Sequence, residues 1–578
     1  MIKNKMNYKE IKYLNDKYEK KVNLIASIRL ITFIIMLLSY ILKHYYYQNI
    51  NTIIFIITLI TFIILILIHS KYHKIYNYYH NYLEIIEEYI KRTNGEWKNF
   101  KDTGESFINE KNHFLKDLDI IGKNSLYQLL SIAVTIGGKR KLVKRLSNNN
   151  IKNLELEQQA IEELSNNINF CIEYQIILKN YNNENIDLSN ELSNLTKSTN
   201  INKIDLLIGL ILTIINISTL ILSITNIINI NIFYLSFIMN FLINYIYSYI
   251  HNIEYKKLNS IYKTYKNIPN LVDVIIKNEF TSKKLSNIKT NLKNNYKEIN
   301  NIEKFETINN LRNNIISNFI LNGISNLNIF ILYYFNNFIN KNLIKLKENI
   351  DDIEELEALI SLAGLSFIKE NITIPKQTKE IEISFNNIHH PLLDEKQCIT
   401  NNFNTIEGIN IITGSNMGGK TSFLRTIGIN IILMNAGSFV CASNFVSNYF
   451  KIFTSMRIND DINLGISTFY GELIRIKEMI DYLDKDNMLV LIDEIFKGTN
   501  YQDRIYGATK VIEKLNNKKT ITLLTTHDFE LCDINNIKNY HFKEYYEDNK
   551  IYFDYKIREG KCTSTNAKYL MKKLNIIE

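Results

Sequence analysis

Cysteine and proline are scarce in this sequence, and the scarcity of cysteine argues against two classes of site. The chain has five cysteines and three prolines among 578 residues, and no two cysteines form a C-x-x-C pair. Zinc sites and disulfide frameworks need cysteines at short, regular spacings, so the sequence predicts no zinc and suits a reducing cytosol. Asparagine, isoleucine, lysine and tyrosine are abundant. This bias is typical of A/T-rich coding sequence, so asparagine runs such as Asn148–Asn150 carry no functional argument. The cysteines are Cys171, Cys398, Cys441, Cys532 and Cys562.

Charge is nearly absent from two long stretches near the N-terminus. Leu24–Leu42 is mostly Ile, Leu, Phe and Met and is broken by Arg29, and Ile53–Ile68 has only Thr58 and Thr61 as polar residues. A helix needs about 20 apolar residues to cross a bilayer. With the flanking Tyr and His included, both stretches are good candidates for spans, joined by the short linker 46–52. The alternative is a pair of helices buried in a soluble core.

A second apolar pair follows further along the chain. Leu206–Leu222 and Ile232–Ile250 are apolar with scattered Asn, Ser and Thr, and Asn216 and Asn240 would need hydrogen-bond partners inside a membrane bundle. We therefore predict a second transmembrane hairpin. A third stretch, Ile315–Phe335, is interrupted by four asparagines, and we predict a core helix there and not a span. These asparagines are Asn318, Asn322, Asn326 and Asn328.

The most informative motif lies in the C-terminal third. Residues Ile411–Thr426 read IITGSNMGGKTSFLRT and contain G-x-x-x-x-G-K-[ST], with an apolar run before it and a helix-like run after it. Glycines let backbone N–H groups converge on a phosphate, and the new helix points its positive end at the same place. Lys420 would reach the β- and γ-phosphates and Thr421 would ligate Mg²⁺. The alternative is a glycine-rich turn with no ligand. The predicted nucleotide-binding residues are Gly414, Ser415, Asn416, Met417, Gly418, Gly419, Lys420, Thr421 and Ser422.

Two further apolar runs end in polar residues that suit the same chemistry. Met488–Glu494 reads MLVLIDE, and a buried strand with this ending can place Asp493 near Mg²⁺ and Glu494 beside the attacking water. Ile521–His527 reads ITLLTTH, and His527 at its tip could sense the γ-phosphate, the alternative being a structural histidine. Together these runs predict an α/β P-loop ATPase domain that uses ATP and Mg²⁺.

The letters inside the loop resemble one family. GSNMGGK is similar to the loop of the MutS family of DNA mismatch-repair ATPases, and the resemblance extends over roughly 115–200 and 300–575. It implies an ABC/MutS-type nucleotide domain attached to an all-α core and lever. The segments that carry it are DDINLGISTFYGE (460–472), LIDEIFKGTN (491–500), HHPLL (389–393), TIGGKRKLVKRL (135–146), EQQAIEEL (157–164), LEALISLAGLSF (356–367) and TSTNAKYL (563–570).

The resemblance also implies a homodimer. In the family two ATPase domains face each other, and each signature segment completes the site of the other subunit. Ser467 would donate to the γ-phosphate bound by the partner, with Asn463 and Thr468 nearby, and a GxST turn offers suitable donors. The same letters fit an ordinary helix N-cap. The predicted catalytic residues are thus Glu494, Lys420, His527 and Ser467, and the candidates for adenine contact are His390, Pro391 and Phe403.

The sequence departs from the family in two places. No soluble mismatch-reading domain occupies the N-terminal region, and the second apolar pair lies where the family's helical core is interrupted by a DNA clamp. We expect the membrane hairpin to replace that clamp. A basic group could still contact DNA phosphate, although a solvated face or a lipid contact is at least as good an interpretation. It consists of Lys139, Arg140, Lys141, Lys144 and Arg145.

Three functions remain open at this point. The first is a membrane-anchored MutS-like ATPase with ATP-dependent binding of mismatched, damaged or branched DNA. The second is an ATP-switched membrane protein that acts on a protein or lipid partner without DNA. The third is an ABC-type transporter, which is disfavoured because the chain lacks an LSGGQ-type signature. The net charge of +9 is compatible with DNA, with an anionic membrane face or with basic loops.

Basic residues predict the orientation of the spans. The first 21 residues carry seven lysines, whereas the turns 46–52 and 227–231 carry no Lys or Arg. Because basic residues stay on the cytoplasmic side, we expect an integral protein of the inner or plasma membrane with its N-terminus and ATPase domain in the cytoplasm. No small-residue cleavage site follows the first run, so a signal peptide is not expected. The predicted units are a transmembrane hairpin (1–75), the first part of the core (76–203), a second hairpin (204–252), lever and core helices (253–370) and the ATPase domain (371–578). Apolar residues of the first part of the core show heptad-like spacing over 115–164.

Overall fold

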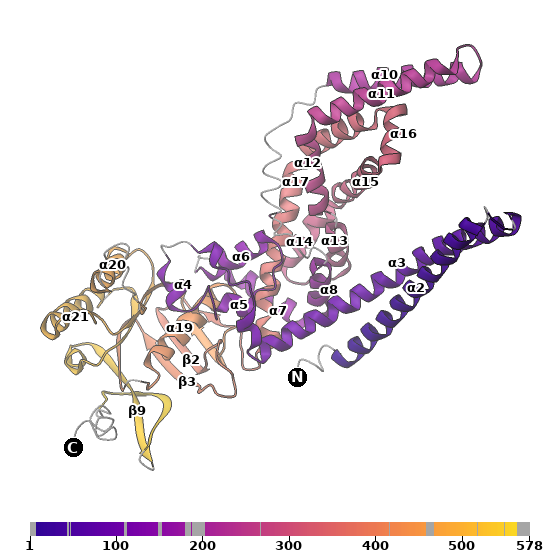
Figure 1. The fold of residues 1–578 in the computed structure, drawn as a ribbon. Helices are drawn as coiled ribbons and strands as arrows, with labels where there is room; N and C mark the ends of the chain where they lie inside the picture. Colours follow the sequence, from indigo (N-terminus) through magenta and orange to yellow (C-terminus); the bar gives the residue numbers. More distant parts are fainter. Residues whose placement is uncertain are drawn as a thin grey trace.

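The chain folds into a C-terminal α/β domain, which is the predicted ATPase domain, a helical core and two long helical hairpins (Figure 1). A computed structural model describes residues 7–42, 45–46, 48–108, 112–147, 153–179, 187, 203–265, 267–415, 417–457, 468–516, 518–547 and 550–562. Both hairpins point away from the ATPase domain toward the same side of the molecule, and the core lies between (Figure 1). In the described part of the chain, four helices are long and apolar enough to cross a membrane.

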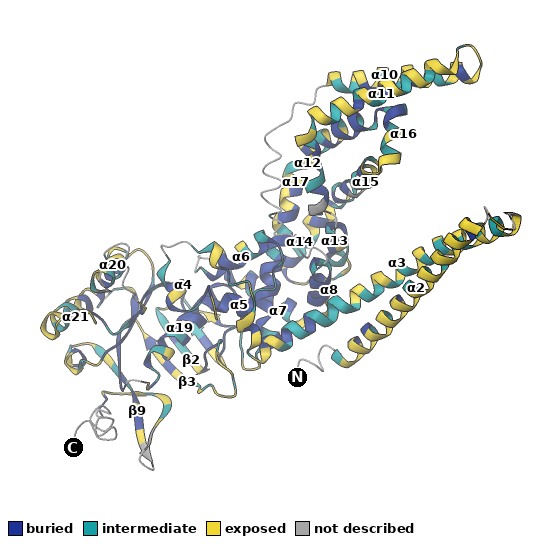
Figure 2. Cartoon of the chain, in the orientation of Figure 1, coloured by how far each residue is buried: buried dark blue, intermediate teal, exposed yellow. Residues whose placement is uncertain are grey.

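The first hairpin consists of α2 (Tyr8–Leu42) and α3 (Gln48–Thr93), which pack along each other. Their outer halves expose large apolar side chains such as Leu30 and Ile57 (Figure 2). The helix α3 continues across residue 75, and its second half enters the core, where Ile85 and Tyr89 are buried. The predicted hairpin boundary at 75 thus falls inside one continuous helix.

The second hairpin consists of α10 (Lys203–Ile224) and α11 (Ile230–Ile250), with α16 (Ile315–Ser325) packed beside them. The single core helix expected over Ile315–Phe335 is wrong. The chain breaks at Asn326, which adopts a left-handed φ of 52°, and α16 meets α17 (Leu327–Ala363) at 89°. Asparagine tolerates this backbone conformation better than most residues, which explains the break at that position.

The helical core gathers many short helices around the lever α17. The described residues of the heptad-like stretch over 115–164 form four separate helices, and turns at Gly122 and Thr135 separate the first three of them. The lever docks on the start of α6 (Ile136–Leu146), where the Glu357 carboxylate accepts from Val134 N at 2.7 Å and Thr135 N at 3.1 Å. The remaining elements are η1 (Glu96–Asn99), η2 (Glu105–Phe107), α4 (His113–Asp117), α5 (Leu126–Leu130), α7 (Leu154–Asn166), α8 (Ile168–Lys179), α12 (Asn252–Tyr265), α13 (Ile268–Lys277), α14 (Lys283–Asn294), α15 (Tyr296–Asn313) and α18 (Leu365–Ile368).

The ATPase domain contains two sheets. The larger has the strand order β10-β9-β4-β8-β7-β6, with β9, β4, β8, β7 and β6 mutually parallel and β10 antiparallel at the edge. The smaller has the order β1-β5-β2-β3. The strands are β1 (Lys376–Gln377), β2 (Glu382–Ile388), β3 (Asn401–Ile406), β4 (Gly408–Thr413), β5 (Asn444–Ser447), β6 (Lys451–Ser455), β7 (Met488–Asp493), β8 (Thr520–Thr525), β9 (Ile537–Glu547) and β10 (Lys550–Glu559). The helices are α19 (Lys420–Asn435), α20 (Thr468–Asp481), α21 (Tyr501–Leu515) and η3 (Phe529–Asp533).

Strand order in the larger sheet determines where the site forms. The strands β4, β8 and β7 are adjacent, although β8 comes last of the three in the sequence. Parallel strands end at the same edge of a sheet, and ligands of open α/β sheets bind beyond that edge. The three sequence motifs therefore meet at one place.

Candidate functional site

The loop between β4 and α19 can be built only with glycine at two positions. Gly414 has a φ of 136°, and a Cβ there would lie 2.6 Å from the carbonyl oxygen of Phe542. Gly419 has a φ of 103°, and its Cβ would lie 3.1 Å from Cδ1 of Tyr555. Both values lie in the region that side chains disfavour. Phe542 and Tyr555 thus pack closely against the loop backbone. A close approach to backbone N–H groups is what phosphate recognition requires.

The lysine of the motif is held inside this loop. Lys420 is 5% exposed, and its Nζ donates to the carbonyl oxygens of Gly414 at 2.6 Å and Ser415 at 3.1 Å. Burial lowers the pKa of Lys420, and the carboxylates of Glu494 and Asp493 oppose that shift. The hydroxyl of Ser415 is buried without a hydrogen-bond partner. A buried cation beside an unsatisfied hydroxyl in a glycine loop fits a bound phosphate group.

A threonine–aspartate–threonine chain links the loop to the two neighbouring strands. The Thr421 hydroxyl donates to Asp493 Oδ2 at 2.8 Å, and the Thr525 hydroxyl donates to Asp493 Oδ1 at 2.6 Å. Hydroxyl and carboxylate oxygens are ligands that Mg²⁺ prefers. Thr421 and Asp493 are therefore positioned to hold Mg²⁺ with a nucleotide.

The carboxylate after Asp493 is paired with the histidine at the tip of β8. Nε2 of His527 lies 3.3 Å from Glu494 Oε1 and 3.4 Å from Lys420 Nζ. The hydrogen bond from His527, more than the charge of Lys497, lowers the pKa of Glu494 to about 2 despite partial burial. Glu494 has a φ of 59°, a strained backbone of the kind found at functional sites. At neutral pH it is ionised and able to accept a proton.

The structure brings most of the predicted site residues together. Lys420, Thr421, Asp493, Glu494 and His527 meet at one edge of the sheet, linked by the contacts given above. Around them, Gly418 is buried in the loop, Met417 is 84% exposed, and Ser422 is exposed in the first turn of α19. The predicted Asn416, Asn463 and Ser467 lie outside the described residues, as does the side chain of Thr468.

All three candidates for adenine contact are buried. Phe403 is 6% exposed and packs among other aromatic rings, 5.6 Å from Phe423 between ring centroids. His390 is buried, burial lowers its pKa to about 3, and its Nδ1 accepts from Leu392 N at 3.2 Å. Neither ring has a free face, so the structure does not support their role as stacking partners. Pro391 is also buried.

Sequence reasoning missed an aromatic ring beside the loop. Tyr555 lies at an irregularity of β10, between Phe553 and Ile557, and has a φ of 54°. Tyr555 is 44% exposed, and a Cβ on Gly419 would lie 3.1 Å from Cδ1 of its ring. No motif marks this tyrosine, because its position depends on the pairing of β10 with β9 and of β9 with β4.

Sequence reasoning also missed a junction with the helical core. Asp117 at the end of α4 is 1% exposed and accepts from the Thr454 hydroxyl at 2.7 Å and from Arg475 Nη1 at 2.7 Å. Asp119 in the next turn pairs with Arg425 of α19 and with Arg457. One turn of the core thereby contacts the helix after the phosphate loop and both sides of the segment 458–467.

The basic group on α6 is largely offset by carboxylates of the same chain. Among the described residues, four members of this group make ion pairs with the lever or with neighbouring core segments. These charges attach α6 to its surroundings, so they do not form a free basic face. The pairs are Lys139 with Asp102 (2.8 Å), Arg140 with Asp187 (2.8 Å), Lys141 with Asp351 (2.6 Å) and Arg145 with Glu157 (2.9 Å).

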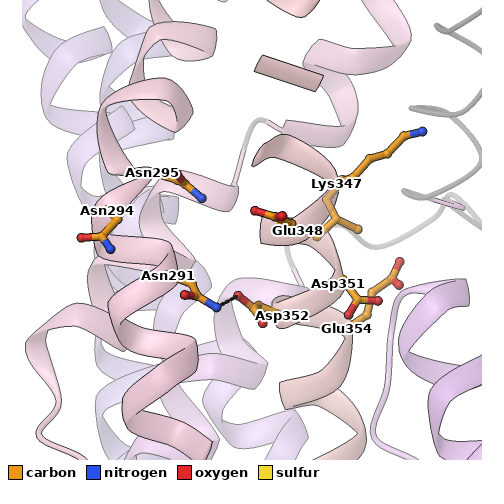
Figure 3. A pocket seen from close by; sticks show the side chains of 9 residues that line it. Asn291, Asn294, Asn295, Lys347, Glu348, Asp351, Asp352 and Glu354 are labelled. Atoms are coloured by element: carbon orange, nitrogen blue, oxygen red, sulfur yellow. Dashed lines mark hydrogen bonds between the residues drawn. The ribbon is translucent and has the colours of Figure 1, made fainter. Parts of the chain in front are cut away.

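A separate cavity of about 820 Å³ lies between the end of α14, the turn at Asn295 and the lever. Asparagines line one wall and carboxylates of the lever line the other, and Asn291 donates to Asp352 (Figure 3). Burial raises the pKa of Asp352 to about 6. Acidic lining repels phosphate, so this cavity does not compete with the glycine loop as a nucleotide site.

Comparison with known proteins agrees with this geometry in the C-terminal part of the chain. Residues 410–573 match the family described as MutS domain V. The DNA mismatch repair protein MutS of Aquifex pyrophilus is 31% identical over 232 residues, covering 38% of this chain and 27% of that protein. MutS protein homolog 4 of Homo sapiens is 33% identical over 232 residues, covering 37% and 24%. Endonuclease MutS2 of Clostridium novyi is 30% identical over 217 residues, covering 36% and 27%.

These matches concern the ATPase part alone. Residues 410–573 are similar to MutS domain V, and the relatives that match this part are named as MutS proteins. The chain spans about a quarter of the length of the curated relatives that it matches.

Proposed function

We propose that this chain is an ATPase of MutS-like type that hydrolyses ATP in a composite dimer site. We propose further that it is anchored in a membrane, and that it couples hydrolysis to ATP-dependent binding of mismatched, damaged or branched DNA. The observation that carries the ATPase proposal is the cluster at the ends of β4, β7 and β8, where Lys420, Asp493 and Glu494 meet beside a glycine loop. The match to MutS domain V supports it.

Each residue of the cluster has a role that follows from its contacts. Lys420 and the loop N–H groups bind the phosphates, and Thr421 and Asp493 would hold Mg²⁺, which would neutralise part of the phosphate charge. Glu494 is ionised at neutral pH, and we assign to its carboxylate the orientation of the attacking water and the acceptance of its proton. His527 contacts both Glu494 and Lys420, so it is placed to register the γ-phosphate.

A second subunit would complete the site. The segment before α20 carries Ser467, which we assign to the γ-phosphate bound by the partner. The Glu472 carboxylate on α20 accepts from Phe496 N at 3.0 Å, so the signature helix is attached to the loop that follows Glu494. Closure of the dimer would therefore be transmitted directly to the carboxylate that activates water.

Substitution of Glu494 by Gln tests the ATPase assignment. Glu494→Gln keeps the size of the side chain and removes the proton acceptor, so we expect retained ATP binding, loss of hydrolysis and a trapped dimer. Hydrolysis is measured by phosphate release and dimerisation by light scattering of detergent-solubilised protein. Glu513→Gln, an exposed carboxylate on α21, is the matched control. Phosphate release by Glu494→Gln at the parent rate would show that Glu494 is not the base.

Membrane anchoring is the second part of the proposal. It is supported by four long apolar helices with exposed outer halves, and by the common direction of both hairpins (Figures 1 and 2). The short turns that lack Lys and Arg would lie outside the cytoplasm, and the N-terminus and ATPase domain inside. Release of the protein from membranes by alkaline carbonate would contradict integral anchoring.

DNA binding is the third part of the proposal. One observation favours the alternative, a protein that does not bind DNA. The ion pairs of α6 leave few of its charges for phosphate, which favours an ATP-switched protein that acts on a membrane partner without DNA. Binding to homoduplex, mismatched and branched DNA across a salt series separates the two. DNA handling predicts structure-selective binding that ATP modulates and salt weakens, because phosphate contacts release counterions. Absence of such binding alongside intact ATPase activity would assign the protein to the membrane task.

A further inference from the structure

The helix α16 is too short to cross a bilayer, yet its outer face is apolar. At 1.5 Å per residue its 11 residues span about 16 Å, whereas the hydrocarbon layer is about 30 Å thick. Four large apolar side chains are exposed along it: Ile315 at 86%, Ile316 at 71%, Phe319 at 47% and Ile320 at 45%. Such a face is costly to leave in water.

The same helix packs against the middle of the second hairpin. The Phe319 ring lies 5.2 Å from that of Phe237 and 5.0 Å from that of Phe241, between centroids, and both partners sit near the midpoint of α11. A Cβ on Gly323 would lie 2.2 Å from the Phe237 ring, so glycine permits this close approach. The exposed face of α16 is therefore continuous with the exposed face of the predicted span.

The end of α16 is capped by side chains of the hairpin. A helix leaves its last four carbonyl groups without partners in the helix, and in hydrocarbon each unsatisfied group costs several kcal/mol. Here three of those carbonyls accept from buried asparagine amides of α10 and α11, where water would serve if the end were solvated. Asn244 donates to Asn322 O at 3.3 Å, Asn240 donates to Gly323 O at 3.0 Å, and Asn216 donates to Gly323 O and, at 3.4 Å, to Ile324 O.

The sequence on both sides of α16 and throughout the second hairpin carries no charged side chains over long stretches. No Asp, Glu, Lys or Arg occurs between Asp205 and Glu254, or between Arg312 and Lys341. Asn326, at the break after α16, is fully buried and donates to Thr213 Oγ1 of α10 at 3.1 Å. The polar side chains at the end of α16 and on the facing sides of α10 and α11 thus face one another, and the outer face of α16 is apolar.

We propose that α16 is a third membrane element, which enters the bilayer beside the second hairpin, lies in its hydrocarbon at mid-hairpin level and turns back at Asn326 into the lever. This inference rests on the proposed membrane anchoring. Its consequence is mechanical: the lever α17 starts inside the bilayer and ends at the ATPase domain, where the Ser438 hydroxyl donates to Leu362 O at 3.2 Å. The ligand of this surface is the acyl region of phospholipid.

Quenching of tryptophan fluorescence by brominated phospholipid tests the placement in reconstituted full-length protein. The chain has one tryptophan, Trp97, which is 3% exposed in the core and gives a constant background. Phe319→Trp and, as a second position, Ile320→Trp report on α16. Leu235→Trp on α11 (65% exposed) reports on the predicted span, and Ile344→Trp on the lever (74% exposed) is the matched aqueous control. Circular dichroism verifies that each variant folds.

We expect the α16 reporters to be quenched to the same extent as Leu235→Trp, with Ile344→Trp unchanged. Quenching of Leu235→Trp alone would overturn the inference and leave the membrane anchor intact. Absence of quenching at all positions would refute the anchor itself. Equal quenching of Ile344→Trp would also overturn the inference, since the middle of the lever would then lie in hydrocarbon as well.

Discussion

Replacement of Glu354 by Gln should change how stability depends on pH. Glu354 lies on the lever, 4% exposed, with Oε1 buried and unpaired, and it also lines the acidic cavity (Figure 3). Burial, followed by the charge of Glu357, raises its pKa from 4.5 to about 7. The carboxyl packs directly on α6, because a Cβ on Gly137 would lie 1.8 Å from its Cδ. The other charged groups that act on it are Asp351, Lys141 and Asp187.

The sign and size of the effect follow from this raised pKa. The folded protein holds a proton that the unfolded chain releases above pH 4.5, so stability is full below that value and falls as the pH rises to about 7. At roughly 1.4 kcal/mol per pH unit, the full loss is about 3 kcal/mol. Glu354→Gln stays neutral in both states, so its stability should exceed that of the parent by about this amount at pH 8 and by little at pH 5.

Thermal unfolding in detergent, followed by Trp97 fluorescence between pH 5 and 8, measures the difference. A shift of about 2–4 °C per kcal/mol is expected for a domain of 150–250 residues. Glu348→Gln is the matched control, since Glu348 is an exposed carboxylate on the same cavity wall. Parallel pH profiles for the parent and Glu354→Gln would refute the reasoning, because they would show that Glu354 titrates alike in the folded and unfolded states.

Three further outcomes are expected. Gly414→Ala should abolish ATP binding and destabilise the domain by at least about 1–2 kcal/mol, because the φ of 136° at Gly414 and the Phe542 carbonyl leave no room for a methyl group. Fluorescent-nucleotide titration measures the affinity and thermal unfolding measures the stability, and a normal ATP affinity would contradict the prediction. Asp117→Asn should destabilise the protein by about 3–5 kcal/mol, since Arg475 loses a buried partner; an unchanged unfolding midpoint would remove Asp117 from the junction. Tyr555→Ala should weaken ATP binding, with Tyr555→Phe as control, because stacking on a base is worth about 1–3 kcal/mol; equal affinities for ATP and for inorganic triphosphate in the parent would exclude such stacking.

The phosphate-binding loop and its partner strands were predictable because their signals are local. The loop conformation depends on glycines at fixed offsets, and each buried strand ends in the polar residue that the chemistry needs, so the letters of Ile411–Thr426 and Met488–Glu494 suffice. Apolar runs without charge were equally readable, and the four long helices match them. What the letters could not reveal was that β8 lies between β4 and β7, since strand order depends on packing of the whole sheet.

By itself, the sequence determined which residue types stand at the glycine loop and at the strand ends, and which segments are long and apolar, because both depend on side-chain type and short spacing. Only the tertiary structure decided the break at Asn326, the position of Tyr555 and the carboxylate junction at Asp117. Each of these depends on a partner far along the chain: Asn216 is 107 residues from Gly323, and Asp117 is 358 residues from Arg475. From the sequence, an asparagine in an apolar run can only be identified as a polar interruption. The hydrogen-bond acceptor of its amide becomes known only from the folded chain.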